Sequence, residues 1–415
     1  MDQPIRQRNH HQASLSDAMR LAYLAYLAVP ACAAVVVYVY LRRRSRRGTV
    51  VADVSSWTRP HTPGALTPEE LTQFFEDGYV VKKALLPPHK IEDAIADVKA
   101  LVAELARRLH RKGRLTSLHE GLPFEKRLCK IEAECPHASV LLHKNGVLPP
   151  GIARLWTEDA MLGVARQVLG DNFGGHPVWN LRCKTPESLS GGQATVPWHQ
   201  DTSYLAPSCW DRLQLTAWVP LVPTDVSNGC MQVLRGGHRT GVTAEHTCCV
   251  GGTWYTELVP SELPRLGIDD INRDLVSCEL GPGDVLFLNN IVPHRSLPNT
   301  SDGVRWSLDL RWQRTGEPNG FEGVKDNLEM VRDGAVLRPI EWGAWASHDR
   351  QKAAVEALRA DGGSRAQEAR AAVDAAHAQG DGGDDELDTT IAGPWMAQWP
   401  LVHHNRHTQA FLDAQ

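Results

Sequence analysis

The chain has 415 residues, of which 42% are hydrophobic and 22% are charged, so it is long enough to bury the core of one large domain with smaller appendages. Its formal net charge is −5, and no basic stripe marks the region that we expect to fold, which argues against a nucleic-acid partner. The nine cysteines show no Cys-x-x-Cys pair and no zinc spacing, so we expect reduced thiols in a cytosol-facing protein, with the adjacent pair Cys248 and Cys249 inert.

The N-terminal region contains a long apolar segment. Residues 21–41 carry no charge and are long enough to cross the roughly 30 Å hydrocarbon core of a bilayer as a helix. Five arginines follow within 42–47, so the positive-inside rule places the later domain in the cytosol and the short tail 1–20 across the membrane. A cleaved signal peptide and a mitochondrial presequence are alternatives. The length of the apolar run argues against both, and we expect a single-pass anchor.

A linker and several helices follow the predicted anchor. Residues 42–65 combine the basic flank with a linker that ends in proline and glycine. Thr67 followed by Pro68 is a helix start, with threonine as the cap and proline at the first helical position. Apolar residues at helical spacing predict an amphipathic helix over 91–109, and another helix is expected over 157–169.

Strand-like runs dominate from about residue 178 to 313. The apolar run 285–288 follows a Gly-Pro-Gly-Asp turn and is typical of a buried strand. Residues 305–312 alternate polar and apolar side chains, which puts Arg305 and Ser307 on one face and large apolar residues on the other. We therefore expect a mainly β fold with flanking helices, a double-stranded β-helix (jelly roll, cupin-like) with a polar interior.

Two short motifs in this region carry chemistry. His199 and Asp201 stand at i and i+2 at the end of an extended segment, on one face if it is a strand, and His294 arrives from a distant strand. Two imidazoles and one carboxylate form a facial triad that leaves positions on Fe(II) open for a cosubstrate and O₂. Arg305 follows as a fixed cation suited to bidentate binding of a carboxylate. Together these residues predict a non-haem iron oxygenase that uses a 2-oxo acid.

Further motifs surround these residues in a definite order. They are Leu66-Thr67-Pro68-Glu69-Glu70, Trp198-His199-Gln200-Asp201, Asn228-Gly229-Cys230-Met231, His294-Arg295-Ser296 and Arg305-Trp306-Ser307. In this order and spacing the chain resembles the phytanoyl-CoA dioxygenase family of Fe(II)/2-oxoglutarate oxygenases over roughly residues 66–312.

The resemblance implies roles for individual residues. The implied iron ligands are His199, Asp201 and His294. The implied contacts with 2-oxoglutarate are Arg305, at its far carboxylate, and Ser296, Trp218 and Lys130. Because Asp201 keeps the carboxylate that related halogenases replace by Ala or Gly, the resemblance implies hydroxylation, with release of succinate and CO₂. The predicted anchor adds the expectation of a small or lipid-like organic substrate.

Two other function classes remain open from the residues alone. A metal-dependent cupin isomerase shares the barrel and the histidines but has no need for Arg305 or Ser296. A non-catalytic, membrane-anchored binding protein keeps the fold, and the intact triad counts against it. The pocket loops identify neither the substrate nor its site of hydroxylation, and the oligomeric state stays open.

The composition changes after the oxygenase domain, which we expect over 66–345. Residues 346–390 are rich in Ala, Gly and acidic residues and predict one short helix and a flexible acidic tether. The tail 391–415 regains tryptophan and proline, and we expect it to dock on the domain.

Overall fold

The computed structural model describes residues 50–57, 63–144, 147–320, 327–342, 387–391, 393 and 395–413. The predicted anchor 21–41 and nearly all of the predicted tether lie outside these residues. Within the part of the chain that is described, no helix combines the length and the apolar character needed to cross a bilayer.

The helices before the sheets begin where their capping signals stand. Helix α3 (Pro68–Asp77) starts after Thr67, which forms a reciprocal capping box with Glu70. The two later helices expected from the sequence are α4 (Pro88–Arg111) and α8 (Asp159–Leu169). The other helices are α5 (Phe124–Glu134), α6 (Ala138–Lys144), α7 (Pro150–Trp156), α9 (Glu187–Ser190), α10 (Ile271–Asp274), α13 (Trp395–Gln398) and α14 (Arg406–Leu412), and the 3₁₀ helices are η1 (Val54–Trp57), η2 (Asp201–Tyr204), η3 (Pro207–Cys209) and η4 (Pro260–Leu266).

Two antiparallel sheets build the core. The larger has eight strands in the order β1-β9-β4-β11-β2-β12-β13, with β3 also paired to β11, and the smaller has the order β10-β5-β8. Leu286 and Leu288 of the larger sheet share one buried cluster with Met231 and Val233 of the smaller, so the sheets pack face to face. The strands are β1 (Tyr79–Lys82), β2 (Phe173–Gly175), β3 (Asn180–Lys184), β4 (Gln214–Pro220), β5 (Met231–Leu234), β6 (His246–Cys248), β7 (Thr256–Leu258), β8 (Leu275–Cys278), β9 (Val285–Asn289), β10 (His294–Ser296), β11 (Arg305–Arg314), β12 (Leu328–Arg332) and β13 (Ala335–Val336).

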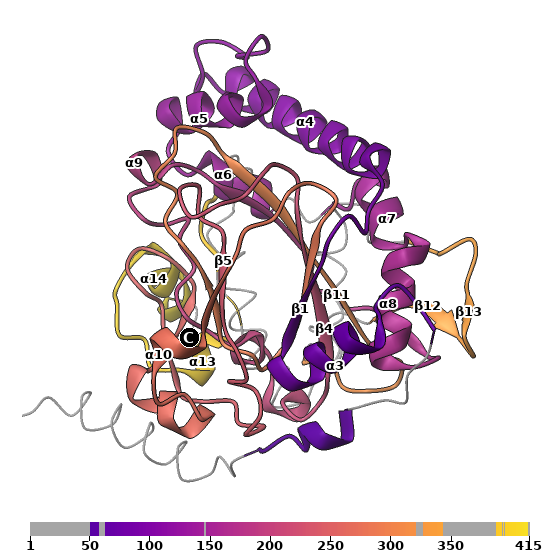
Figure 1. The fold of residues 1–415 in the computed structure, drawn as a ribbon. Helices are drawn as coiled ribbons and strands as arrows, with labels where there is room; N and C mark the ends of the chain where they lie inside the picture. The colour runs from indigo at the N-terminus through magenta and orange to yellow at the C-terminus, as the bar shows by residue number, and fades with distance from the viewer. Residues whose placement is uncertain are drawn as a thin grey trace, which may run out of the picture. The chain divides into compact units, whose positions relative to one another are not determined.

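The expectation of a mainly β core with flanking helices is confirmed, and the two facing sheets are consistent with a jelly roll. Figure 1 shows α7 and α8 on one side of β1, β4 and β11, with β5 on the other side. Alternation along the strands sorts side chains between these two sides. In β11, the residues that pack with the helices are Trp306, Leu308, Leu310 and Trp312, and those that line the interior are Arg305, Asp309 and Arg311.

The folded unit begins earlier than the predicted end of the linker. The Ala52 amide donates to the Gly241 carbonyl at 2.8 Å, and Trp57 is buried. Part of the predicted linker 42–65 therefore packs on the domain, because Ala52 and Trp57 bury apolar surface that a free linker would leave in water.

The two adjacent cysteines are bonded to each other, so the prediction of reduced thiols was wrong at this pair. Cys248 and Cys249 are both fully buried, and their Cα atoms lie 3.1 Å apart. A disulfide between neighbours in the chain has no Cys-x-x-Cys spacing, so that pattern does not predict it. The other cysteines in the described residues form no disulfide.

The C-terminal tail, for which we expected docking, contacts two segments of the domain, around Ser203–Trp210 and at Trp254. The Trp399 ring stacks on Trp210 with centroids 5.7 Å apart, and its Nε1–H donates to the Ser203 carbonyl at 2.7 Å. The Trp395 Nε1–H donates to the Trp254 carbonyl at 2.9 Å. The tail thus holds two loops that border the interior, one of them directly after Asp201.

Candidate active site

The predicted triad comes together inside the barrel. His199, Asp201 and His294 are buried, and their ligand atoms all lie within 4.8 Å of one another. Asp201 Oδ1 is 3.6 Å from His199 Nε2 and 3.7 Å from His294 Nε2. A single cation at this point can contact all three side chains, and two nitrogens with one carboxylate suit Fe(II).

The backbone around the first two triad residues differs from the expected strand. His199 and His294 form one isolated bridge, with amide-to-carbonyl distances of 3.0 and 2.9 Å, and Asp201 opens the 3₁₀ helix η2. Gln200 between them is fully buried, and its Nε2 donates to the Ile291 carbonyl at 2.6 Å. A bend anchored by Gln200, rather than strand alternation, therefore turns Asp201 toward both imidazoles.

Both imidazoles are oriented through Nδ1. The Nδ1–H of His199 donates to the Pro197 carbonyl at 2.9 Å, and that of His294 donates to the Val292 carbonyl at 3.0 Å. Because a carbonyl only accepts, the proton lies on Nδ1 and each Nε2 keeps a lone pair for a metal. Burial lowers the pKa of His294 to about 4, so this imidazole is neutral at pH 7.

The Asp201 carboxylate is held at its outer oxygen. Oδ2 accepts hydrogen bonds from Arg311 Nη2 and Thr216 Oγ1, both at 3.1 Å, which leaves Oδ1 facing the imidazoles. Burial raises the pKa of Asp201, but the Arg311 guanidinium opposes that effect, and the pKa lies well below its usual range. The sequence analysis did not identify Arg311, although the alternation that singled out Arg305 puts Arg311 on the same face.

Arg305 is a buried cation in the same cavity. It is 3% exposed, its Nη1 donates to Ser307 Oγ at 2.6 Å, and its Cζ lies 5.2 Å from the centroid of the Trp218 ring. Its Nε has no hydrogen-bond partner. Burial lowers the pKa of Arg305 to about 10, so the guanidinium stays charged at pH 7. A carboxylate bound here would supply the missing partner.

The cavity that joins the triad to Arg305 has an empty volume of about 430 Å³, including space open to solvent. Ser296 and Trp218, both predicted as cosubstrate contacts, line it, and Ser296 Oγ accepts the Val196 amide at 3.1 Å. Lys130 does not line it. That residue is exposed on α5, so the structure does not bring this implied cosubstrate contact to the cavity.

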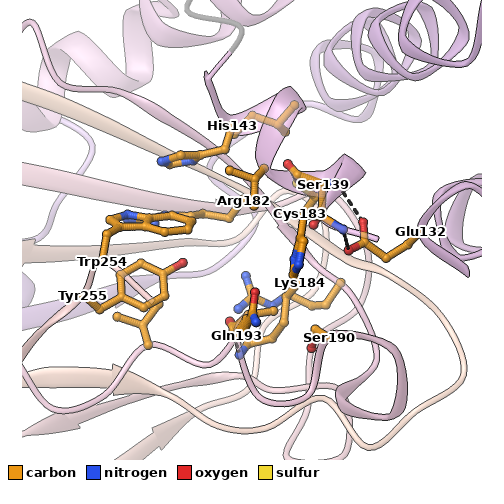
Figure 2. Close-up of a pocket in the computed structure, with 16 residues that line it drawn as sticks. Glu132, Ser139, His143, Arg182, Cys183, Lys184, Ser190, Gln193, Trp254 and Tyr255 are labelled. Carbon is orange, nitrogen blue, oxygen red and sulfur yellow. Dashed lines mark hydrogen bonds between the residues drawn. The ribbon is translucent and has the colours of Figure 1, made fainter. Parts of the chain in front are cut away.

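A second cavity adjoins the first, because Arg182, Val196 and Arg305 line both. Its empty volume is about 610 Å³, including space open to solvent. Figure 2 shows Trp254 and Tyr255 on one side of it, with Arg182 between them and the polar residues of the other side. The sequence analysis did not foresee this cavity, since its walls come from α5, α6, β3 and two loops far apart in the chain.

Comparisons with known proteins agree with the motifs. The family model described as phytanoyl-CoA dioxygenase (PhyH) matches residues 64–307. The 1-deoxypentalenic acid 11-beta-hydroxylase of Streptomyces arenae is 30% identical over 190 residues, which are 43% of this chain and 62% of that protein. The chain therefore spans less than two thirds of this relative. A 2-aminoethylphosphonate dioxygenase from an uncultured bacterium is 24% identical over 254 residues, which are 60% of this chain and 83% of that protein.

Solved structures with low sequence identity are also similar. The apo form of the non-heme monooxygenase ThoJ has a TM-score of 0.44 and 19% identity, covering 70% of this chain and 98% of that one. EctD from S. alaskensis with 2-oxoglutarate and 5-hydroxyectoine has a TM-score of 0.42 and 17% identity, covering 74% and 93%.

Proposed function

This chain belongs to the phytanoyl-CoA dioxygenase family, as its motifs indicated, and we propose that it is an Fe(II)- and 2-oxoglutarate-dependent dioxygenase that hydroxylates a small organic molecule. One observation carries the proposal: the triad and Arg305 line the same cavity, and among the described residues the Nε of Arg305 has no hydrogen-bond partner. A metal site needs only the triad. The additional buried cation indicates a cosubstrate with a carboxylate.

The donor set fits both groups. Nε2 of His199, Nε2 of His294 and Oδ1 of Asp201 would hold Fe(II), and Arg305 with Ser296 would hold the far carboxylate of 2-oxoglutarate. When bound, iron and 2-oxoglutarate supply the activation of O₂ that ends in succinate, CO₂ and a hydroxylated product. The protein supplies position and charge, and the buried walls exclude water.

The chain's own residues keep the site in its binding form. The carbonyls that accept from Nδ1 fix the tautomer of both histidines, so Nε2 is free without a proton transfer. Arg311 keeps Asp201 ionised, and the apolar side of Trp218 lies beside the Arg305 guanidinium. These contacts prepare the site before either ligand arrives.

The location of the enzyme and the nature of its substrate are further parts of this proposal. The uncharged run 21–41 followed by arginines supports a single-pass membrane anchor with the catalytic domain in the cytosol. An anchor at a membrane and the aromatic second cavity favour a substrate with a large apolar, lipid-like part. Alkaline extraction of membranes from cells that express the full chain, compared with a chain lacking 21–41, tests the anchor. Release of both proteins alike contradicts it.

Anaerobic optical titration tests the chemistry. The full chain with Fe(II) and 2-oxoglutarate should develop the visible charge-transfer band of the chelate. His294→Ala should lose metal and band together. Arg305→Ala should bind metal as before and need much more 2-oxoglutarate for the same band. Lys130→Ala, at the exposed helix position, is the matched control and should behave as the unmodified protein does.

The outcome separates the function classes. Metal binding without a 2-oxoglutarate band would favour the cupin isomerase. Absence of both would favour the non-catalytic binding protein. Equal loss of metal and 2-oxoglutarate on Arg305→Ala would mean that Arg305 supports the triad instead of the cosubstrate.

A further inference from the structure

We propose that the second cavity selects an organic substrate with an anionic group, a carboxylate in the simplest case, held by Lys184 and Arg182 while its apolar part lies against Trp254 and Tyr255. This rests on the proposed function only in naming the bound molecule as the substrate. Three observations carry it: an uncompensated buried lysine, a fixed guanidinium, and an aromatic wall opposite them.

Lys184 is the first observation. It is the cross-strand partner of Arg305 in the β3–β11 pairing, and the two residues are 2% and 3% exposed. Lys184 Nζ donates to the Ala194 carbonyl at 2.7 Å and to Thr195 Oγ1 at 3.3 Å, which are both neutral acceptors. Burial and the neighbouring Arg305 hold the pKa of Lys184 well below its usual range. An anion bound beside Nζ favours the ammonium form, which has a third donor for that ligand.

The charges of the interior leave Lys184 without a counterion. Arg182 pairs with Asp309 at 2.7 Å, and Arg311 pairs with Asp201 at 3.1 Å. The far carboxylate of 2-oxoglutarate would compensate Arg305. Within the described residues, no acid forms an ion pair with Lys184, and a buried cation is strongly stabilised when an anion joins it.

Glu132 is the one acid among the residues that line the second cavity, and it is engaged elsewhere. Its two oxygens accept the backbone amides of His137 at 2.7 Å and Ser139 at 2.8 Å. Figure 2 shows Glu132 turned to Ser139 at the side of the cavity, away from Trp254. Glu132 therefore binds the amides at the start of α6 and does not neutralise the lysine.

Arg182 is placed to share the same anion. Its Nε donates to Asp309, which fixes the plane of the guanidinium, and the residue lines both cavities. A guanidinium held in this way presents its remaining N–H groups as a fork that matches a carboxylate. A ligand bound to Arg182 and Lys184 would lie beside the triad cavity, at the position that a molecule to be hydroxylated must reach.

The side of the second cavity opposite Lys184 favours a substrate with a large apolar part. Trp254 and Tyr255 face the cavity, and Val140 of α6 and Val196 complete this side. Trp254 is fixed by the hydrogen bond from Trp395 to its carbonyl, and Trp395 lies beyond the family match. A neutral or cationic molecule of the same shape would fill the aromatic side but would leave Lys184 unpaired.

Calorimetric titration with three compact probes tests the proposal: adamantane-1-carboxylate, 1-adamantanol and 1-adamantylamine. The full chain is loaded with Fe(II) and 2-oxoglutarate without oxygen. Because hydrogen bonds to charged groups are worth more than neutral ones, the carboxylate should bind about tenfold or more tightly than the alcohol, and the amine most weakly. Lys184→Met should lower the affinity for adamantane-1-carboxylate about tenfold, and Lys184→Arg should keep most of that affinity. Lys130→Met is the control for loss of an exposed lysine.

The affinity for 2-oxoglutarate in each variant separates the explanations. Unchanged 2-oxoglutarate binding with lost carboxylate preference supports the proposal and shows that the variant is folded. Equal binding of acid and alcohol by the unmodified chain, or no binding of the acid at millimolar concentration, overturns it without any variant. Weaker 2-oxoglutarate binding in Lys184→Met, with the probe unaffected, overturns it in favour of a cosubstrate role. The optical band of the chelate is a separate measurement, so failure of the oxygenase proposal is distinguishable.

Discussion

Replacing Arg311 by Met tests whether this arginine compensates the buried Asp201. Both side chains are 6% exposed, and Arg311 Nη2 lies 3.1 Å from Asp201 Oδ2. Methionine keeps most of the apolar stem, so the change removes chiefly the charge and its hydrogen bonds. A carboxylate left buried without its partner destabilises a protein by about 3–5 kcal/mol.

This free energy predicts a measurable shift in melting temperature. The unit from Val50 to Gln415 comprises 366 residues. At about 2.1 cal/mol/K per residue, its unfolding entropy is roughly 0.8 kcal/mol/K, so the melting temperature should fall by about 4–6 °C. Thermal unfolding of the metal-free full chain, followed by circular dichroism, measures this shift. With Mn²⁺ at the triad as a redox-stable cation, the shift should become smaller, because the metal supplies positive charge to Asp201.

Arg166→Met is the matched control. Arg166 pairs with Asp171 at 2.6 Å, but the two side chains are 44% and 57% exposed. Such a surface pair contributes less than about 1 kcal/mol. If Arg311→Met lowers the melting temperature no more than Arg166→Met does, or if Mn²⁺ leaves the difference unchanged, Arg311 does not compensate Asp201.

Three further predictions concern the framework of the site. Trp399→Ala should lower the free energy of unfolding in urea by about 3–5 kcal/mol, because it removes a buried ring and the hydrogen bond to Ser203. Trp399→Phe keeps an aromatic ring and should lower it less. Equal losses in the two variants would mean that packing of the ring contributes little. Burial lowers the pKa of His246 from 6.5 to about 3, so the imidazole is protonated more readily in the unfolded chain than in the folded one. The free energy of unfolding should therefore fall as the pH drops below 6.5, by at most about 2 kcal/mol at pH 5. His246→Gln should lose that part of the pH dependence between pH 7 and pH 5, and an unchanged slope would exclude His246 as its source. Gly229 has φ +89°, and a Cβ there would lie 2.5 Å from the Leu297 carbonyl oxygen. Gly113 is the control, because its φ is also positive, at +67°, but a Cβ there would have no described atom within 4 Å. Gly229→Ala should therefore lower the free energy of unfolding by at least about 1 kcal/mol more than Gly113→Ala does.

The types of element and the chemistry that they carry follow from patterns between near neighbours in the sequence. Thr67 and Pro68 set the start of α3, because capping depends on neighbours along the chain. The alternation in β11 separated Arg305 from Trp306, because successive side chains of a strand point to opposite faces. The same local patterns indicated a triad and a carboxylate-binding cation, and the structure brings these residues into one cavity.

Local patterns failed where the neighbour of a residue comes from a distant segment. The resemblance implied that Lys130 contacts the cosubstrate, but the apolar residues of α5 pack inward and leave the lysine in solvent. The bend after His199 depends on the contact between Gln200 and Ile291, which are 91 positions apart. No periodicity near residue 200 contains that contact.

Which charges meet in the interior depends on how distant strands pair in the folded chain. Strand register places Lys184 opposite Arg305 and brings Arg311 to Asp201, 110 positions away in the chain. A shift of one residue in register would exchange the interior and helix-facing sides of a strand. Composition and spacing indicate which residues can bind a metal or an anion. The pairing of distant strands determines which cations find a partner and which, like Arg305 and Lys184, remain for a ligand.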